Sequence, residues 1–233
     1  MNIVAIIPAR GGSKVIPRKN LIDFCGKPLL VWSIQQARQS RSISSVFVSS
    51  DSDEILSVAQ KAGAKAILRP KAIAGDKASS EDALLHALDE IEAGQRKKVD
   101  LMVFLQATSP LRTSGDIDGA IKALISQKAD SLFSAAVLGD FCLWKKKGSK
   151  LESLTFDYRN RGRRQERDPL FLENGSIYVF KPSVLRKSRN RLGGKIAAYV
   201  MPFWQSYEID EMPDVELCGY FMKKKILGGP KRK

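Results

Sequence analysis

The chain is poor in the residues that supply nucleophiles, soft metal ligands and disulfides. Among its 233 residues it has one histidine, His86, and three cysteines, Cys25, Cys142 and Cys218. His86 sits among leucines on a predicted helix, which favours a structural role and leaves histidine-based nucleophilic catalysis without a second imidazole. The cysteines have no metal-ligand spacing and leave an odd thiol in any disulfide scheme. We therefore expect free thiols in a reducing, cytoplasmic compartment.

Other familiar signals are also absent. No apolar run approaches the length of a transmembrane helix and no signal peptide opens the chain, so we predict no membrane association. The string Gly-x-x-x-x-Gly-Lys-Ser/Thr is missing, which excludes a P-loop, and without Gly-x-Gly-x-x-Gly no dinucleotide cofactor is implied. The contents of 43% hydrophobic and 27% charged residues are ordinary for a soluble protein.

Acidic residues are too few to balance the basic ones, and the net charge is +14. This excess favours an anionic partner: a nucleotide, an acidic sugar or a nucleic acid. Much of the charge lies in four basic stretches that are typical of solvated faces or tails, and we interpret 226–233 as a basic tail. Because these stretches contain no recognition motif, we predict no nucleic-acid partner.

A glycine-rich basic loop follows the first predicted strand. The apolar run 3–7 indicates a buried strand, and the loop at 8–20 contains Gly11, Gly12, Arg10, Lys14, Arg18 and Lys19. The glycines allow backbone N–H groups to approach an anion, and the cations can neutralise several negative charges. The loop therefore predicts a polyphosphate site for a nucleoside triphosphate, with a basic surface turn as the alternative.

Strand and helix patterns alternate along the first two thirds of the chain. We predict strands at 3–7, 46–49, 66–68, 101–105 and 131–137. Helices are predicted at 29–37, after Ser52 or Asp53, after Ser79 or Ser80, and from Ser114. This order predicts an α/β fold with a doubly wound, mostly parallel sheet, in a single domain over 1–233. A strand at 175–180 and a helix at 213–222 complete it.

Residues 138–173 break the pattern. The segment lacks a sustained period and is too long for an ordinary connection. Large apolar residues within it would be costly to leave in water: Phe141, Leu143, Trp144, Leu151, Leu154, Phe156 and Tyr158. We predict a projecting arm that forms a homodimer, with a disordered flap as the alternative.

Three further groups of residues could carry chemistry. Gln106 follows a strand at the ligand-binding edge of the sheet. Glu208 and Asp210 would point to one face of an extended segment and form a Mg²⁺ site with substrate phosphates, although paired carboxylates are also common on surfaces. The run 163–165 is either a guanidinium fork for a carboxylate or a solvated loop.

Several short sequence motifs, which follow one another along the chain in the order expected for one family, resemble that family. Ala9-Arg10-Gly11-Gly12-Ser13-Lys14 followed by Lys19-Asn20 resembles the N-terminal signature of acylneuraminate cytidylyltransferases, also called CMP-sialic acid synthetases. Further matches follow over nearly the whole chain: Leu68-Arg69-Pro70, Ala78-Ser79-Ser80, Leu105-Gln106-Ala107-Thr108-Ser109-Pro110-Leu111-Arg112, Arg163-Arg164-Gln165, Asn174-Gly175-Ser176-Ile177-Tyr178 and Glu208-Ile209-Asp210.

The resemblance implies a Rossmann-like nucleotidyltransferase fold, a Mg²⁺ cofactor and a dimerisation arm. It implies nucleotide contacts from Arg10, Gly12, Ser13, Lys19, Asn20, Arg69, Ala78 and Ser80. It places Gln106, Arg164 and Gln165 near the acceptor sugar, with Arg164 supplied by the partner. The metal residues would be Asp210 and Glu208, although Glu208 stands where the sialate enzymes carry Asp. Arg112 is as compatible with a structural role as with a catalytic one.

The implied reaction is transfer of CMP from CTP to a nonulosonic acid. The anomeric hydroxyl would attack the α-phosphorus and pyrophosphate would leave, with catalysis by positioning and charge neutralisation from Arg10, Lys14, Lys19 and Asp210. No residue stands out as a general base, and Asp210 would activate the hydroxyl through the metal. The alternatives are a 3-deoxy-manno-octulosonate cytidylyltransferase and, in another class, a basic nucleic-acid-binding protein.

Overall fold

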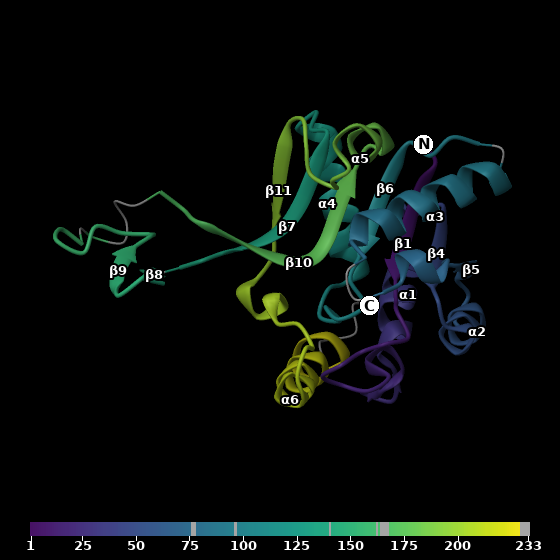
Figure 1. Cartoon of the computed structure of the whole chain (residues 1–233), viewed down its shortest axis with the longest axis horizontal. Coiled ribbons are helices and arrows are strands. Elements are labelled where there is room, and N and C mark those ends of the chain that lie inside the picture. The colour runs from purple at the N-terminus through teal and green to yellow at the C-terminus, as the bar shows by residue number, and fades with distance from the viewer. Residues whose placement is uncertain (76–77, 96, 140, 162, 164–167, 229–233) are drawn as a thin grey trace.

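A central seven-stranded sheet organises the chain (Figure 1). The computed structural model describes residues 1–75, 78–95, 97–139, 141–161, 163 and 168–228. The strand order is β11-β7-β10-β6-β1-β4-β5. The strands are β1 (Ile3–Pro8), β4 (Ser45–Ser50), β5 (Lys65–Leu68), β6 (Leu101–Leu105), β7 (Ser131–Val137), β10 (Phe171–Phe180) and β11 (Ile196–Val200).

The sheet is mostly parallel, as predicted. β1 pairs in parallel with both β4 and β6, and β11 with β7, whereas β10 runs antiparallel between β6 and β7. The apolar residues of β1 are all buried, which explains why this strand reads as an unbroken hydrophobic run. The β10–β7 register shifts between Glu173 and Tyr178, so a bulge lies beside the end of β6.

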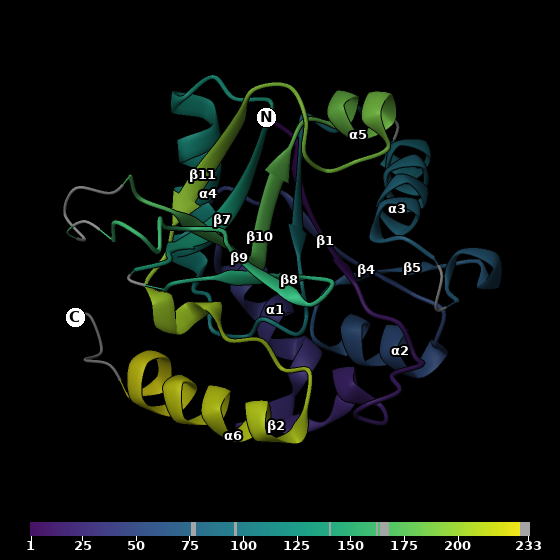
Figure 2. The same cartoon turned by 60° about the vertical axis from the view of Figure 1, so that its left-hand side comes forward.

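Helices cover both faces of the sheet (Figure 2). On one face lie α1 (Leu29–Gln39), α2 (Asp53–Lys61) and α4 (Ser114–Ser126), and on the other α3 (Ser80–Gln95) and α5 (Pro182–Ser188). Their starts follow local chemistry, since Ser52 caps α2 and Thr113 forms a capping box with Asp116 at α4. Ser79 is the predicted serine that caps α3, because its hydroxyl accepts from the Asp82 N–H.

A third apolar cluster lies below the sheet and supports the basic loop. Ile16, Phe24 and Leu29 pack there with Cys218 and Met222. These residues come from the loop, from the small hairpin β2 (Asp23–Phe24) and β3 (Lys27–Pro28), from the start of α1, and from α6 (Met212–Phe221) and its π-helical extension η5 (Met222–Leu227). The described residues also form the short 3-10 turns η1 (Lys19–Leu21), η2 (Lys71–Ile73) and η4 (Phe203–Ser206). The loop and the last helix therefore share one support.

The predicted arm projects from the sheet (Figure 1). It differs from the prediction in where it ends and in having regular secondary structure. It contains a hairpin, β8 (Trp144–Lys147) and β9 (Lys150–Ser153), where no regular structure was predicted. β10 begins at Phe171 rather than at 175, so the arm ends at 170 and not at 173. The sequence prediction also missed α5 and β11 altogether. Among the described residues, no helix is long and apolar enough to cross a membrane.

Candidate active site

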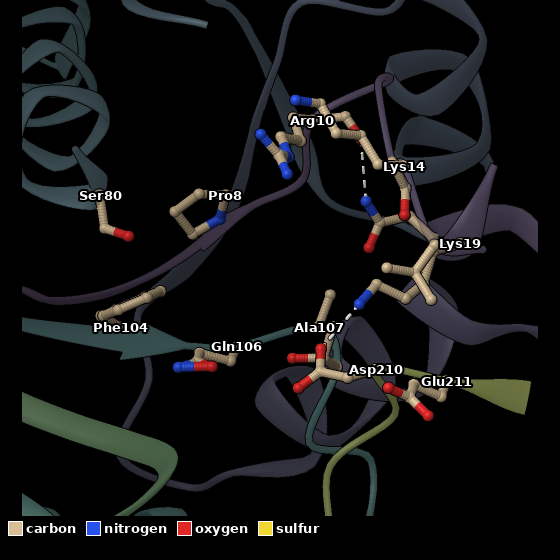
Figure 3. Close-up of a pocket in the computed structure, with 14 residues that line it drawn as sticks. Pro8, Arg10, Lys14, Lys19, Ser80, Phe104, Gln106, Ala107, Asp210 and Glu211 are labelled. Carbon is tan, nitrogen blue, oxygen red and sulfur yellow. Dashed lines mark hydrogen bonds and ion pairs between the residues drawn. The ribbon is translucent and has the colours of Figure 1, made fainter. Parts of the chain in front are cut away.

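A cavity of about 590 Å³ opens at the C-terminal ends of β1 and β6 (Figure 3). It is lined by Pro8, Arg10, Ser13, Lys14, Val15, Lys19, Asn20, Ser80, Phe104, Gln106, Ala107, Thr108, Asp210 and Glu211. Ser80, Phe104 and Gln106 lie on one side, and Lys14 and Lys19 on the other. The structure therefore brings predicted phosphate and sugar residues to one site, at the edge where open α/β sheets bind ligands.

A second cavity of about 220 Å³ adjoins the first. It shares Pro8, Arg10 and Ser80 with it and adds Arg69 and Ala78, both of which were predicted to contact the nucleotide. The Arg69 side chain is only 7% exposed, and its Nε and Nη2 atoms have no hydrogen-bond partner among the described residues. Burial lowers the pKa of Arg69, and the Asp51 carboxylate at 3.9 Å opposes that shift. These buried donors are available to a polar ligand.

The basic loop is fastened at both ends. The Gly11 N–H donates to Oδ1 of Asp51 at 3.0 Å, and the Asn20 amide donates to the Arg10 carbonyl at 3.0 Å. In this structure the Gly11 N–H is therefore already used by the Asp51 carboxylate. Gly12 is exposed and lines neither cavity. Arg18, in a left-handed conformation, pairs with Glu54 outside the cavity.

The loop is also tied to the acidic turn before α6. Lys19 Nζ lies 2.8 Å from Asp210 Oδ1 and donates to the Ile209 carbonyl at 3.1 Å. Asp214 accepts from the backbone N–H groups of Asp210 and Glu211 and so caps the start of α6. The Asp210 side chain is 69% exposed and lines the cavity. A cation and a carboxylate thus stand together at its wall.

Glu208 lies apart from that wall and does not line the cavity. Its carboxylate faces Gly175, where an added Cβ would come 2.3 Å from Oε1 of Glu208 and 3.0 Å from Nε2 of Gln106. Burial raises the pKa of Glu208 to about 7, the Asp210 carboxylate adds to the rise, and the Arg112 guanidinium opposes it. Of the predicted acidic pair, only Asp210 faces the cavity. No group of three or more potential metal ligands occurs in the described part of the chain.

Arg112 holds the turn that follows β6. Its guanidinium is fully buried and donates to the Gln106 carbonyl at 3.1 Å and to the Ser33 hydroxyl at 2.8 Å. Burial lowers the pKa of Arg112 to about 9, while Glu208 and Asp116 act in the opposite direction. Arg112 therefore positions Gln106 and lies outside the cavity, which decides between its two interpretations.

Some lining residues were missed by sequence reasoning. Phe104 was predicted only as part of a strand, Pro8 opens the predicted basic loop and Thr108 was given no ligand role, yet each borders the cavity. The strand-end rule that found Gln106 contained the signal for them. Arg164 and Gln165 lie outside the described residues, whereas Ser13, Lys14 and Asn20 line the cavity as expected.

The fold and the site define a class: an α/β protein with a basic cavity at the C-terminal edge of its mostly parallel sheet. Comparison with known proteins narrows this class. The family model described as cytidylyltransferase matches residues 4–179. The chain therefore belongs to the cytidylyltransferase family.

Individual relatives agree with this membership. The chain is 36% identical over 213 residues to an N-acylneuraminate cytidylyltransferase of Oncorhynchus mykiss, covering 90% of this chain and 48% of the relative. It is 44% identical over 136 residues to a pseudaminic acid cytidylyltransferase of Campylobacter jejuni, covering 58% of each. The chain thus spans about half the length of the curated relatives it matches.

Solved structures support the fold. A CMP:2-keto-3-deoxy-manno-octonic acid synthetase complexed with CTP superposes with a TM-score of 0.70 at 19% identity, covering 97% of this chain and 100% of the other. A 4-diphosphocytidyl-2C-methyl-D-erythritol synthase from Anaerococcus prevotii gives 0.68 at 11% identity, covering 95% and 98%. These likenesses confirm the predicted Rossmann-like architecture.

Proposed function

We propose that this chain transfers CMP from CTP to the anomeric hydroxyl of a nonulosonic acid and releases pyrophosphate. One observation carries this proposal: the same cavity has Arg10, Lys14 and Lys19 on one side and Gln106 on the other. Cations on that side suit a triphosphate, and the amide suits a hydroxylated acceptor. Family membership and the named relatives support the same reaction.

The nucleotide would extend from one cavity into the other. Arg69, Ala78 and Ser80 would surround the cytidine, since Nε and Nη2 of Arg69, which lack a hydrogen-bond partner among the described residues, would donate to acceptors of a cytosine ring. Arg10 borders both cavities and would contact the phosphates between them, with Ser13, Lys14, Lys19 and Asn20 beyond. The N-terminus of α3 at Ser80 adds a partial positive charge to the same region.

Catalysis would come from positioning and charge neutralisation. Gln106, held by Arg112 through its carbonyl, would orient the acceptor so that its anomeric oxygen faces the α-phosphorus. Lys14, Lys19 and Arg10 would stabilise charge that develops on the pyrophosphate as it leaves. The described residues offer no histidine to this cavity, so the proton of the hydroxyl would leave to a carboxylate or to water.

The residues present fit a Mg²⁺ ion through one carboxylate. Mg²⁺ at substrate phosphates is commonly held by one or two carboxylates, and Asp210 is a largely exposed carboxylate at the cavity wall. When bound, the ion would neutralise phosphate charge. We propose Asp210 as its protein ligand, whereas Glu208, the second predicted ligand, lies behind it and does not line the cavity.

A homodimer is part of the proposal. The arm exposes Leu151, Leu154 and Tyr158 by 64%, 59% and 50%, which favours burial against a second copy. That contact would bring Arg164 and Gln165 of one copy to the acceptor in the other. The three free cysteines fit a reducing cytoplasm.

Pyrophosphate release from CTP tests the reaction. The acceptors to compare are N-acetylneuraminic, legionaminic and pseudaminic acids, with 3-deoxy-manno-octulosonate as the competing substrate class. We expect release that depends on one of the nonulosonic acids and is weaker with the octulosonate. Release with the octulosonate alone would replace the proposed acceptor class, and no release with any sugar would refute the reaction.

A further inference from the structure

Asp51 interacts with both halves of the proposed nucleotide site but lines neither cavity. It directly follows β4, which pairs with β1 on one side and with β5 on the other. Its Oδ1 atom accepts a hydrogen bond from the Gly11 N–H at 3.0 Å. The same oxygen lies 3.9 Å from Nη2 of Arg69. One carboxylate oxygen therefore faces the basic loop on one side and a buried guanidinium on the other.

The backbone around Asp51 is held by the neighbouring strands. The Ser49 carbonyl accepts from the Ala9 N–H at 2.9 Å, and the Ser50 carbonyl accepts from the Arg69 N–H at 2.8 Å. The residue after Asp51 caps α2 through its hydroxyl. Asp51 is therefore a fixed point between the loop after β1 and the segment after β5.

The Asp51 carboxylate also lies near two like charges. Arg10 precedes Gly11 and borders both cavities, whereas Arg69 borders the second one. Burial lowers the pKa of Arg69, Asp51 opposes that shift, and Arg10 adds to it. At 3.9 Å the carboxylate forms an ion pair and no hydrogen bond with Nη2 of Arg69, so this nitrogen keeps its donors for a ligand. Asp51 thus offsets the repulsion between two guanidinium groups without occupying their donors.

We propose that Asp51 is a positioning residue that fixes the phosphate-binding loop and the Arg69 guanidinium at the separation that one nucleotide requires. This inference rests on the proposed function, because it takes the loop to bind the triphosphate and Arg69 to contact the cytosine. The charge of Asp51 by itself repels phosphate, so Asp51 favours binding only by preorganising the donors around it. The sign of the effect of its removal therefore separates positioning from simple electrostatics.

The test measures the Kd of inorganic triphosphate and of CTP by calorimetry, without sugar. Asp51→Ala removes both contacts, and we expect triphosphate to bind about 10-fold more weakly, as for the loss of a hydrogen bond to a charged group. Asp51→Asn keeps an oxygen that accepts from the Gly11 N–H and removes the charge. It should bind triphosphate at least as tightly as the wild type. Its ratio of the CTP Kd to the triphosphate Kd should rise about fivefold, because Arg69 loses its ion pair.

Asp53→Ala and Asp53→Asn are the matched controls. Asp53 is exposed at the first position of α2 and lines neither cavity, so these variants remove the same charge two residues away. They should leave both constants unchanged. Tighter or unaltered triphosphate binding by folded Asp51→Ala, or an equal effect of Asp53→Ala, would overturn the assignment.

Thermal unfolding of each variant shows whether it is folded. If Asp51→Ala does not fold, the Asp51→Asn variant decides, and an unchanged ratio of its two constants would overturn the assignment. A folded wild-type protein that binds neither CTP nor triphosphate would instead refute the proposed function, so the two failures are distinguished.

Discussion

Lys19 Nζ lies 2.8 Å from Oδ1 of Asp210, although the two residues stand near opposite ends of the chain. The contact joins the basic loop after β1 to the acidic turn before α6 across the mouth of one cavity. It therefore fixes the cations proposed to bind phosphate relative to the candidate metal ligand. A shared apolar cluster beneath them, which includes Ile16 and Cys218, supports both the loop and the acidic turn.

Lys14→Ala should lower turnover and leave the fold intact. Lys14 is exposed on the loop and lines the cavity, so its loss opens no core cavity. Removing one preorganised donor to developing charge costs about 10²- to 10³-fold in kcat. The exposed Lys61 at the end of α2 offers a control, and Lys61→Ala should turn over normally. Normal turnover of Lys14→Ala at saturating CTP would end this assignment.

Asp210→Asn should raise the Mg²⁺ concentration needed for half-maximal activity. An amide is a poorer ligand than a carboxylate for this hard cation, and we expect a rise of at least about 10-fold, since losing even an outer-shell partner has that effect. Glu216→Gln, on the exposed face of α6, serves as the charge-matched control. Full activity of the wild type in excess chelator would contradict the metal assignment.

Gly175→Ala should destabilise the protein more than Gly148→Ala. Both glycines have a positive φ, +66° and +63°, which costs an alanine about 1–2 kcal/mol. Only at position 175 would the new Cβ collide, at 2.3 Å from Glu208, whereas Gly148 has open space around it. Urea unfolding gives the two free energies. Equal losses would show that the Glu208 side chain moves aside at little cost, which would contradict the expected clash.

Shortening the arm should abolish the dimer. The Leu138 N–H donates to the Leu170 carbonyl at 2.8 Å, so a short Gly/Ser turn can replace 139–169 without moving the ends of β7 and β10. Sedimentation should give a dimer for the intact chain and a monomer of much lower activity for the shortened one. An intact monomer, or a shortened chain that still dimerises and works, would argue against the arm as the interface.

The sequence predicted the strands from β1 to β7 of the central sheet because they are short, apolar and separated by amphipathic helices, whereas it missed the parallel strand β11. β8 escaped prediction because its residues, Trp144–Lys147, are all exposed and show no alternation of apolar and polar side chains. The seven-residue α5 is short and carries Arg186 and Lys187 in its last turn, although Pro182 at its first position was a usable start signal. Strands and helices with such weak sequence patterns form only when they pack against other parts of the fold.

Site residues could be predicted where several residues of one charge lie close together in the sequence. They could not be predicted where the direction of a side chain depends on contacts with distant parts of the chain. The cluster of basic residues in the loop predicts a phosphate site, and Lys14 and Lys19 line the cavity as expected. The spacing of Glu208 and Asp210 suggested one shared face. The path of the turn beside Gly175 instead directs Glu208 inward, and no local pattern encodes that neighbour.

The most direct test of the account is the phosphorus balance of the complete reaction. ³¹P NMR of the protein with CTP, Mg²⁺ and a nonulosonic acid should show a phosphodiester signal from a CMP-sugar growing together with an equal amount of pyrophosphate. Omitting the sugar should leave CTP intact. Conversion of CTP to free CMP without the sugar, or no phosphodiester with any nonulosonic acid, would contradict the proposed transfer.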